Sequence, residues 1–265
     1  MKRLLRHYFP YSLVLALCWG GALWLLPLSA NARTLEQIKA LGAISMCANP
    51  DALPYSSSKD APPGFQVEIG RKIAEGLGVQ LNIDWIVPRR RAKVVNCDML
   101  LDRPNDPTIY EGRLLLSLPY QKSSVVLGLS RGASMIYDYK ELNSGQKVGV
   151  MISSAASVLL NRAHKSTTPY AFQTDMMDDL AKGELFGAAV SSPQMSYYMF
   201  QHPEAGLQQS SAFDSAVDLT WEISVGLRNA DQALVDAINP VIFKLLADGT
   251  ITQIYAKYGV EHRRP

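Results

Sequence analysis

The chain has 265 residues, of which 48% are hydrophobic, and its 26 Lys and Arg nearly balance its 24 Asp and Glu. A formal net charge of +2 gives no reason to expect nucleic acid or an anionic membrane surface as a partner. The composition is that of an ordinary globular protein, and the length allows one domain or two lobes with a sizeable core.

The first segment predicts an export signal. "MKRLLRH" is basic, "YSLVLALCWGGALWLLPL" is apolar, and "SANA" ends with the small-x-small pattern of Ala30 and Ala32. We expect a signal peptide at 1–32, cleaved after Ala32. The alternative is a membrane anchor, because the apolar run is about long enough to span a bilayer. A lipoprotein site at Cys18 is disfavoured because a bulky residue precedes it.

The next hundred residues alternate strands and helices. A short helix or turn at 34–42 leads into the strand "AISMC", and "FQVEIGRKIAEGLG" (65–78) has apolar residues four apart, which is typical of a helix that Gly78 ends. Strands are expected at 79–87, 97–102 and 123–130. Strands that alternate with helices predict a parallel sheet with covering helices.

A second α/β unit follows. Its expected strands are 145–151, 185–192 and 220–228, and its expected helices are 153–163, 176–184, 192–201, 230–249 and 250–259. A serine caps the first of these helices, Pro193 suits the first turn of another, and Asn239-Pro240 predicts a kink or break. Two units in tandem predict an α/β protein with two lobes.

Two cysteines, Cys47 and Cys97, follow the leader. An even number of cysteines in an exported protein favours a disulfide. The alternative is two buried thiols, because Cys47 ends the first expected strand and Cys97 starts the third. Neighbouring parallel strands would hold such positions on the order of 10 Å apart, beyond the reach of a disulfide. Both alternatives stay open.

Motifs typical of enzymes give little support for catalysis. "SSSK" (56–59) fits S-x-x-K but lies in an expected loop, and no K-T-G follows. The sequence holds no G-x-S-x-G, H-E-x-x-H or glycine-rich phosphate loop. His164, His202 and His262 are far apart and lack metal-ligand spacing. We therefore expect no catalytic residue, metal or cofactor, with a small enzyme on this scaffold as the alternative.

Four stretches resemble the two-lobed periplasmic solute-binding proteins, in particular the amino-acid-receptor branch. They are "PPGFQVEIGRKIAEGLGVQL", "ELNSGQKVGVMISSAAS", "DDLAKGELFGAAVSSPQMSYYM" and "ISVGLRNADQALVDAINPVIFKLLADGTITQIYAKYG". The resemblance implies a type II periplasmic-binding-protein fold, in which each lobe is a mostly parallel sheet flanked by helices. It implies that 33–128 and 220–265 form lobe one and 129–219 forms lobe two. It also implies a periplasmic protein of a Gram-negative bacterium.

A narrower resemblance rests on "CANPDALPYS", "WIVPRRR", "NCDMLL" and the ending "YGV". These segments are similar to the subset that accompanies periplasmic PQQ-dependent methanol dehydrogenases. That resemblance implies an accessory protein that contacts the dehydrogenase and helps it mature or become active. The cationic run Arg89, Arg90 and Arg91 is then a docking patch for an acidic partner, or otherwise a solvated turn. The alternative function is a receptor that delivers a small polar solute to an ABC permease.

In such a fold the ligand would lie between the lobes, at the carboxyl ends of parallel strands. Tyr55 offers a flat apolar face with a hydroxyl, and Arg113 resembles the arginine that clamps a ligand carboxylate in amino-acid receptors. The candidate cleft residues are Asn49, Asp51, Tyr55, Thr108, Arg113, Ser153, Ser154 and Ser191.

One expected residue type is missing. In amino-acid receptors an acidic residue after a lobe-two strand pairs with the ammonium group of the ligand. The corresponding segment here is "GAAVSSPQ", with Ser191 and Ser192 and no acid. We therefore do not expect the chain to bind an α-amino acid in the usual way. A different solute, or none, would occupy the site.

Overall fold

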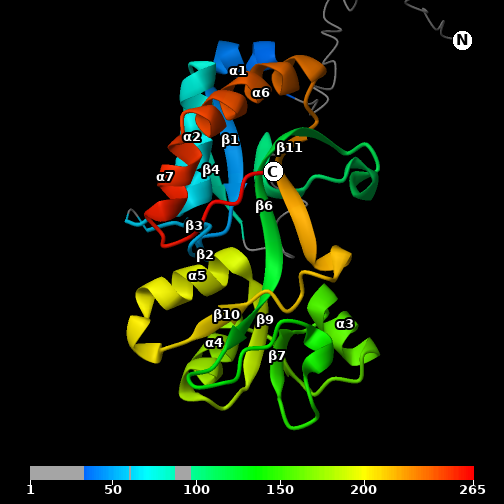
Figure 1. The fold of residues 1–265 in the computed structure, drawn as a ribbon. Helices are drawn as coiled ribbons and strands as arrows, with labels where there is room; N and C mark the ends of the chain where they lie inside the picture. The colour runs from blue at the N-terminus through cyan, green and yellow to red at the C-terminus, as the bar shows by residue number, and fades with distance from the viewer. Residues whose placement is uncertain (1–32, 60, 87–96) are drawn as a thin grey trace, which may run out of the picture. The chain divides into compact units, whose positions relative to one another are not determined.

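The computed structural model describes residues 33–59, 61–86 and 97–265 (Figure 1). The expected leader at 1–32 and the basic run Arg89, Arg90 and Arg91 lie outside the described residues, so what was predicted for them stays a prediction. Among the helices within the described ranges, none combines the length and the apolar character needed to cross a membrane.

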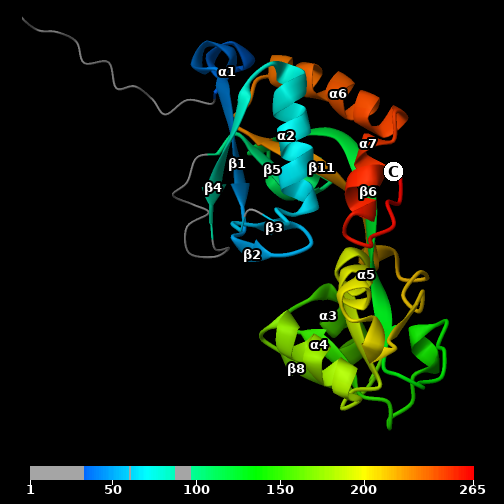
Figure 2. The same cartoon turned by 90° about the vertical axis from the view of Figure 1, so that its left-hand side faces the viewer.

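Parallel strands form the first part of the sheet (Figure 2). β1 (Ala43–Ala48) pairs in parallel with β4 (Gln80–Trp85) on one side and with β5 (Met99–Pro104) on the other. A short hairpin of β2 (Asp51–Ala52) and β3 (Ser56–Ser57) follows β1. The helices of this part are α1 (Leu35–Leu41), α2 (Phe65–Leu77), α6 (Gln232–Ala247) and α7 (Thr250–Ala256).

A second set of strands lies further along the chain. β7 (Val148–Met151) pairs in parallel with β8 (Thr167–Tyr170) and β9 (Gly187–Ser191). The helices are α3 (Ala155–Arg162), α4 (Gln173–Lys182) and α5 (Ser192–Gln201). The short strand β10 (Gln208–Ser210) pairs antiparallel with β6. Four short 3-10 turns are η1 (Pro107–Tyr110), η2 (Tyr139–Glu141), η3 (Pro203–Ala205) and η4 (Val217–Leu219).

One long strand belongs to both sets. β6 (Leu114–Leu129) pairs antiparallel with β11 (Thr220–Arg228) over 114–124 and with β9 over 125–129. Figure 1 shows β6 passing from the upper group of elements into the lower group. The strand order is β4-β1-β5-β11-β6-β9-β7-β8. The predicted α/β class, with helices flanking the sheet, is therefore confirmed.

The side chains fill separate cores. One core draws on residues between Ile38 and Tyr120 and between Ile223 and Val260, and we call the part of the chain around it lobe one. Two further clusters, on residues between Val126 and Leu219, fill what we call lobe two. The residue boundaries of the lobes stay a prediction, because β6 runs through both.

The helices agree well with the predicted periodicity. α2 ends at Leu77, and Gly78 takes the left-handed conformation at φ 70° that the sequence predicted for it. Ser154 caps α3, and Pro193 lies in the first turn of α5. Of the kink or break expected at Asn239-Pro240, the break is absent, because α6 continues through Pro240 to Ala247.

β6 is longer than the expected strand at 123–130. Pro119 argues against a central strand, since proline has no N–H to donate to the ladder. In the structure Gln121 faces Ile223 and Pro119 faces Ser224, so the register shifts by one residue between these pairs. Pro119 thus lies at a β-bulge, where a ladder bond is interrupted in any case. The strand can therefore include Pro119 and begin at Leu114, ahead of the expected range.

Cys47 and Cys97 form a disulfide, with Cα atoms 5.6 Å apart. The expectation that strand geometry holds them apart is wrong, because β5 begins at Met99 and not at Cys97. Met46 faces Met99 in register, and the chain bends at Asp98. That bend brings Cys97 back beside Cys47 at the end of β1.

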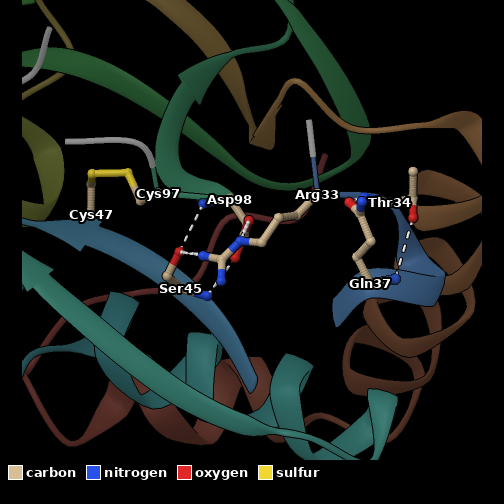
Figure 3. A network of polar contacts seen from close by, with 7 residues as sticks. All are labelled: Arg33, Thr34, Gln37, Ser45, Cys47, Cys97 and Asp98. Carbon is tan, nitrogen blue, oxygen red and sulfur yellow. Dashed lines mark hydrogen bonds and ion pairs between the residues drawn. A yellow bond between two sulfur atoms is a disulfide. The ribbon is translucent and has the colours of Figure 1, made fainter. Parts of the chain in front are cut away.

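Asp98 holds this bend in place (Figure 3). Its carboxylate is 4% exposed and pairs with Arg33, Nε to Oδ1, at 2.7 Å. The backbone N–H and the hydroxyl of Ser45 both donate to Oδ2, at 2.7 and 2.9 Å. A buried carboxylate is tolerated only when it is paired and hydrogen-bonded in this way. The network therefore ties Arg33, β1 and the start of β5 to one carboxylate.

We expect the Cys47→Ser/Cys97→Ser double variant to lose about 4 kcal/mol of unfolding free energy, because the bond closes a long loop in the unfolded chain. The sequence separation of the two cysteines is 50 residues. Urea unfolding of the variant and of the oxidised and reduced wild type measures the change. Equal midpoints for oxidised and reduced protein would contradict this expectation.

Candidate functional site

The segment after β1 forms a loop held by its own polar groups. The Asn49 side-chain oxygen accepts from the Asp51 N–H at 3.0 Å, which is an Asx turn. The Ser56 hydroxyl donates to the Asn49 carbonyl at 2.8 Å. Asp51 is exposed. Asn49 and Asp51 therefore lie at the carboxyl end of β1, where the sequence placed them, and the Asn49 side chain shapes the loop.

Tyr55 connects this loop to lobe two. Its ring packs edge-on against Phe65, with centroids 5.1 Å apart, and its hydroxyl lies 2.7 Å from the hydroxyl of Ser191. Ser191 is the last residue of β9 and directly precedes α5. Burial raises the pKa of Tyr55 to about 12, so its hydroxyl stays protonated at neutral pH. Two predicted site residues from different lobes thus meet in a direct hydrogen bond.

Aromatic side chains continue this contact. Phe65 stacks on Tyr255 at 4.3 Å between centroids, and Tyr258 lies edge-on to Phe65 at 6.2 Å. Tyr197 of α5 reaches Tyr258 at 6.3 Å. The lobe-one end of this cluster is anchored, because the Tyr258 hydroxyl donates to Glu68 at 2.8 Å. α5 of lobe two therefore packs against the residues that follow α7.

The C-terminal tail lies along β6 where that strand passes from lobe one to lobe two. The Lys122 N–H donates to the Arg263 carbonyl at 2.8 Å, and the Arg263 guanidinium donates to Ser124 at 3.0 Å. His262 Nε2 lies 2.8 Å from the Tyr120 carbonyl, so that nitrogen carries the proton. Burial lowers the pKa of His262, which favours this neutral form. The tail thus braces the shared strand.

Ser153 and Ser154 lie at the carboxyl end of β7. The Ser154 hydroxyl accepts from the Ser157 N–H at 3.1 Å and caps α3, as predicted. Ser153 is exposed and has a φ of 62°, which is uncommon for a residue other than glycine. Both residues therefore belong to the same edge of lobe two as Ser191. A role in ligand binding stays a prediction for them.

Arg113 lies away from this edge. Arg113 is 73% exposed and pairs with Glu111 at 3.1 Å. Arg113 directly precedes Leu114, which faces Arg228 in register. The backbone N–H of Arg228 donates to the carbonyl of Asp98, just before β5. Arg113 is therefore level with the amino end of β5, not with the carboxyl end.

Thr108 has a local role. Its N–H and hydroxyl both donate to Asp106, at 3.0 and 2.6 Å, at the start of η1. The structure thus places Arg113 away from the edge that carries Tyr55, and Thr108 stabilises the turn at Asp106. A carboxylate clamp at Arg113 gains no support from this placement.

The sequence analysis missed two charged residues at the end of β5. Asp102 and Arg103 close the apolar run "MLL", and their side chains pair at 2.9 Å. The Asp102 side chain is 58% exposed. A charged pair that directly follows a buried strand was the available signal, because strand ends line the ligand site in this kind of fold.

Apolar side chains are exposed at the lobe-two edge. Ile152 follows β7 and is 56% exposed, and Phe172 follows β8 and is 67% exposed. The Ile152 N–H donates to the Tyr170 carbonyl at 3.0 Å, so the two strand ends are neighbours. This edge therefore offers hydrocarbon surface beside the hydroxyls of Ser153 and Ser154.

Comparison with known sequences gives a family match and several relatives. The model of the bacterial extracellular solute-binding proteins, family 3, matches residues 44–261. The membrane-bound lytic murein transglycosylase F of Yersinia pestis (strain Pestoides F) is 27% identical over 97% of this chain and 54% of its own length. This chain thus spans about half the length of that relative. The lysine/arginine/ornithine-binding periplasmic protein of Escherichia coli (strain K12) is 25% identical over 76% of this chain and 82% of its own.

Solved structures share the fold at low identity. An ancestral cationic amino acid solute-binding protein superposes with a TM-score of 0.72 at 16% identity, covering 84% of this chain and 98% of that one. The L-cystine solute receptor of Neisseria gonorrhoeae, unliganded and open, gives 0.70 at 18% identity, covering 87% and 98%. These matches confirm the predicted type II periplasmic-binding-protein fold.

Replacing Tyr55 by Phe removes the hydroxyl that reaches Ser191 and keeps the ring contact with Phe65. We expect the variant to lose no more than about 1 kcal/mol of stability. We also expect faster amide hydrogen exchange in 49–57 and in the first turn of α5, because the contact between the lobes is lost.

Tyr170→Phe is the matched control. Its hydroxyl donates to Asp179 at 2.7 Å within lobe two, so its loss should affect α4 alone. If Tyr55→Phe leaves exchange in both 49–57 and α5 unchanged, the hydrogen bond does not couple the lobes.

Proposed function

We propose that this chain, which belongs to the bacterial extracellular solute-binding proteins of family 3, is a non-enzymatic receptor that binds a small polar solute for an ABC importer. The observation that carries the proposal is the Tyr55–Ser191 hydrogen bond, which joins the carboxyl-end edges of the two lobes at 2.7 Å. Ligands of open α/β sheets bind at such edges. Solved structures of this fold include substrate-binding proteins of amino acid ABC transporters.

The connection between the lobes supports a receptor that closes on its solute. β6 passes from one lobe to the other, so the lobes can change their separation by small backbone rotations in that strand. A solute that touches both edges binds the closed arrangement better than the open one and shifts the population toward it.

The site argues against the usual mode of α-amino acid binding. By the resemblance, the segment that carries this acid in the amino-acid receptors has Ser191 and Ser192 here. The relatives nevertheless include proteins named for basic amino acids. We therefore propose a small polar solute, an amino-acid-like molecule or an organic acid, held in a different way. We further propose that the protein is exported to the periplasm of a Gram-negative bacterium.

A second candidate is an accessory protein of a PQQ-dependent alcohol dehydrogenase. The observation in its favour is the Cys47–Cys97 disulfide, because both cysteines lie in the segments that carry the narrower resemblance. The family match and the relatives named above give it no support, so it ranks second. Its expected docking patch at Arg89, Arg90 and Arg91 falls outside the described residues.

We propose no enzymatic activity for this chain. The transglycosylase relatives match it over about half of their own length, so their activity does not transfer by similarity alone. Among the described residues, His, Cys, Asp and Glu form no group able to hold a metal ion. Turnover by the purified protein, lost on replacing Asp102 at the site, would promote an enzymatic function.

A thermal-shift screen of amino acids, amines and small organic acids tests the receptor proposal. A true solute at a hundredfold excess over its Kd should add about 2.7 kcal/mol to the unfolding free energy. If no solute raises the midpoint, while a periplasmic PQQ-dependent dehydrogenase co-purifies with the protein, the accessory function replaces the receptor function.

A further inference from the structure

We propose that Asp102 supplies, from lobe one, the carboxylate that binds a positively charged group of the solute. This inference rests on the proposed receptor function and names the solute class: small cationic molecules such as basic amino acids or aliphatic amines. It assigns to β5 the acid that is absent from the end of β9.

The register places Asp102 at the same edge as the Tyr55 loop. β1 and β5 run parallel, and Met46 faces Met99. Counting from that pair, Asp102 is level with Asn49, the first residue after β1. Both therefore lie at the carboxyl ends of their strands, which is where solutes bind in open α/β sheets.

Hydrogen bonds connect the two positions. The carbonyl of Leu101, next to Asp102, accepts from the Tyr120 hydroxyl and from Gln66 Nε2, the latter at 3.3 Å. The Gln66 N–H donates to the carbonyl of Tyr55 at 3.0 Å. Because Gln66 contacts both segments, the backbone of Leu101, next to Asp102, lies near the backbone of Tyr55. The charge of Asp102 also helps to keep the pKa values of Tyr55 and Tyr120 above their ordinary value, after burial as the main cause.

The carboxylate of Asp102 is available to a ligand. Its ion pair with Arg103 joins adjacent residues of one strand, and such exposed pairs contribute little free energy. Two of the other acids near this edge are engaged: Glu68 binds Tyr258 and Lys257, and Glu222 accepts from Asn105 at 3.2 Å. Asp51 is exposed as well, but it belongs to the short hairpin after β1 and not to a strand of the main sheet. An ammonium group can therefore replace the Arg103 contact at Asp102 at low cost.

Lobe two suits the rest of such a solute. Ser191 is uncharged and does not repel a cation. The exposed side chains of Ile152 and Phe172 offer hydrocarbon contact. A small amine with a short aliphatic part thus meets a carboxylate on one side and hydroxyl and apolar groups on the other. The negative charge of Asp102 would repel a dicarboxylic acid.

Isothermal titration with L-lysine, L-arginine, 1,4-diaminobutane and succinate tests this assignment. We expect a cationic probe to bind the wild type and to lose about tenfold or more in affinity in Asp102→Asn, since a charged hydrogen bond is removed. Asp102→Glu keeps the carboxylate and should retain more of the affinity. Unchanged thermal midpoints without solute show that the variants fold.

Glu111→Gln is the matched control. Glu111 is also an exposed acid paired with a nearby arginine, at 3.1 Å, but it is level with the opposite end of β5. The affinity of the Glu111→Gln variant for the cationic probe should equal that of the wild type. Cation binding that is equally strong in Asp102→Asn, or binding of succinate alone, overturns the assignment and leaves the receptor proposal standing. If none of the four probes binds, the assignment falls, and the wider solute screen decides the receptor proposal separately.

Discussion

The whole arrangement depends on β6 pairing with different partners along its length. Its first part completes the sheet of lobe one through β11, and its last part completes that of lobe two through β9. β6 is hydrogen-bonded to β11 up to Ser124 and to β9 from Val125, so both lobes share this strand at the point of passage. The tail residues His262 and Arg263 add contacts to the same passage. Both edges of the site are therefore positioned relative to one strand.

The Tyr55 loop needs a second fixed point. The disulfide Cys47–Cys97 and the Asp98 network hold the end of β1 against the start of β5, so the loop starts from a rigid base. Phe65 supports the ring of Tyr55 from α2. A hydroxyl fixed from two directions in this way is preorganised, and less conformational entropy is lost when it meets a partner.

Local signals in the sequence were sufficient for the helices and for part of the site. The four-residue spacing and Gly78 defined α2, and the serine before "AASVLL" defined the cap of α3. Features set by tertiary contacts were not predictable. The bend that permits the disulfide depends on Arg33, which lies 65 residues from Asp98 in sequence. Asp102 was missed because the charged pair that ends the apolar run "MLL" was not weighed as a strand end. Arg113 was favoured by a motif, and the pairing of β6 with β11 places it at the opposite end of β5.

The composition of the lobe-one core bears on the order of folding. Ile38 and Ile44 pack in one cluster with Ile238 and Tyr255, so contacts within it span most of the chain, whereas the lobe-two clusters draw on one continuous stretch. Contacts distant in sequence form slowly, because the intervening loop must close first. The contacts of the lobe-two clusters are all available once residues 126–219 have been synthesised. Lobe one becomes complete only when the last helices, α6 and α7, arrive to close it.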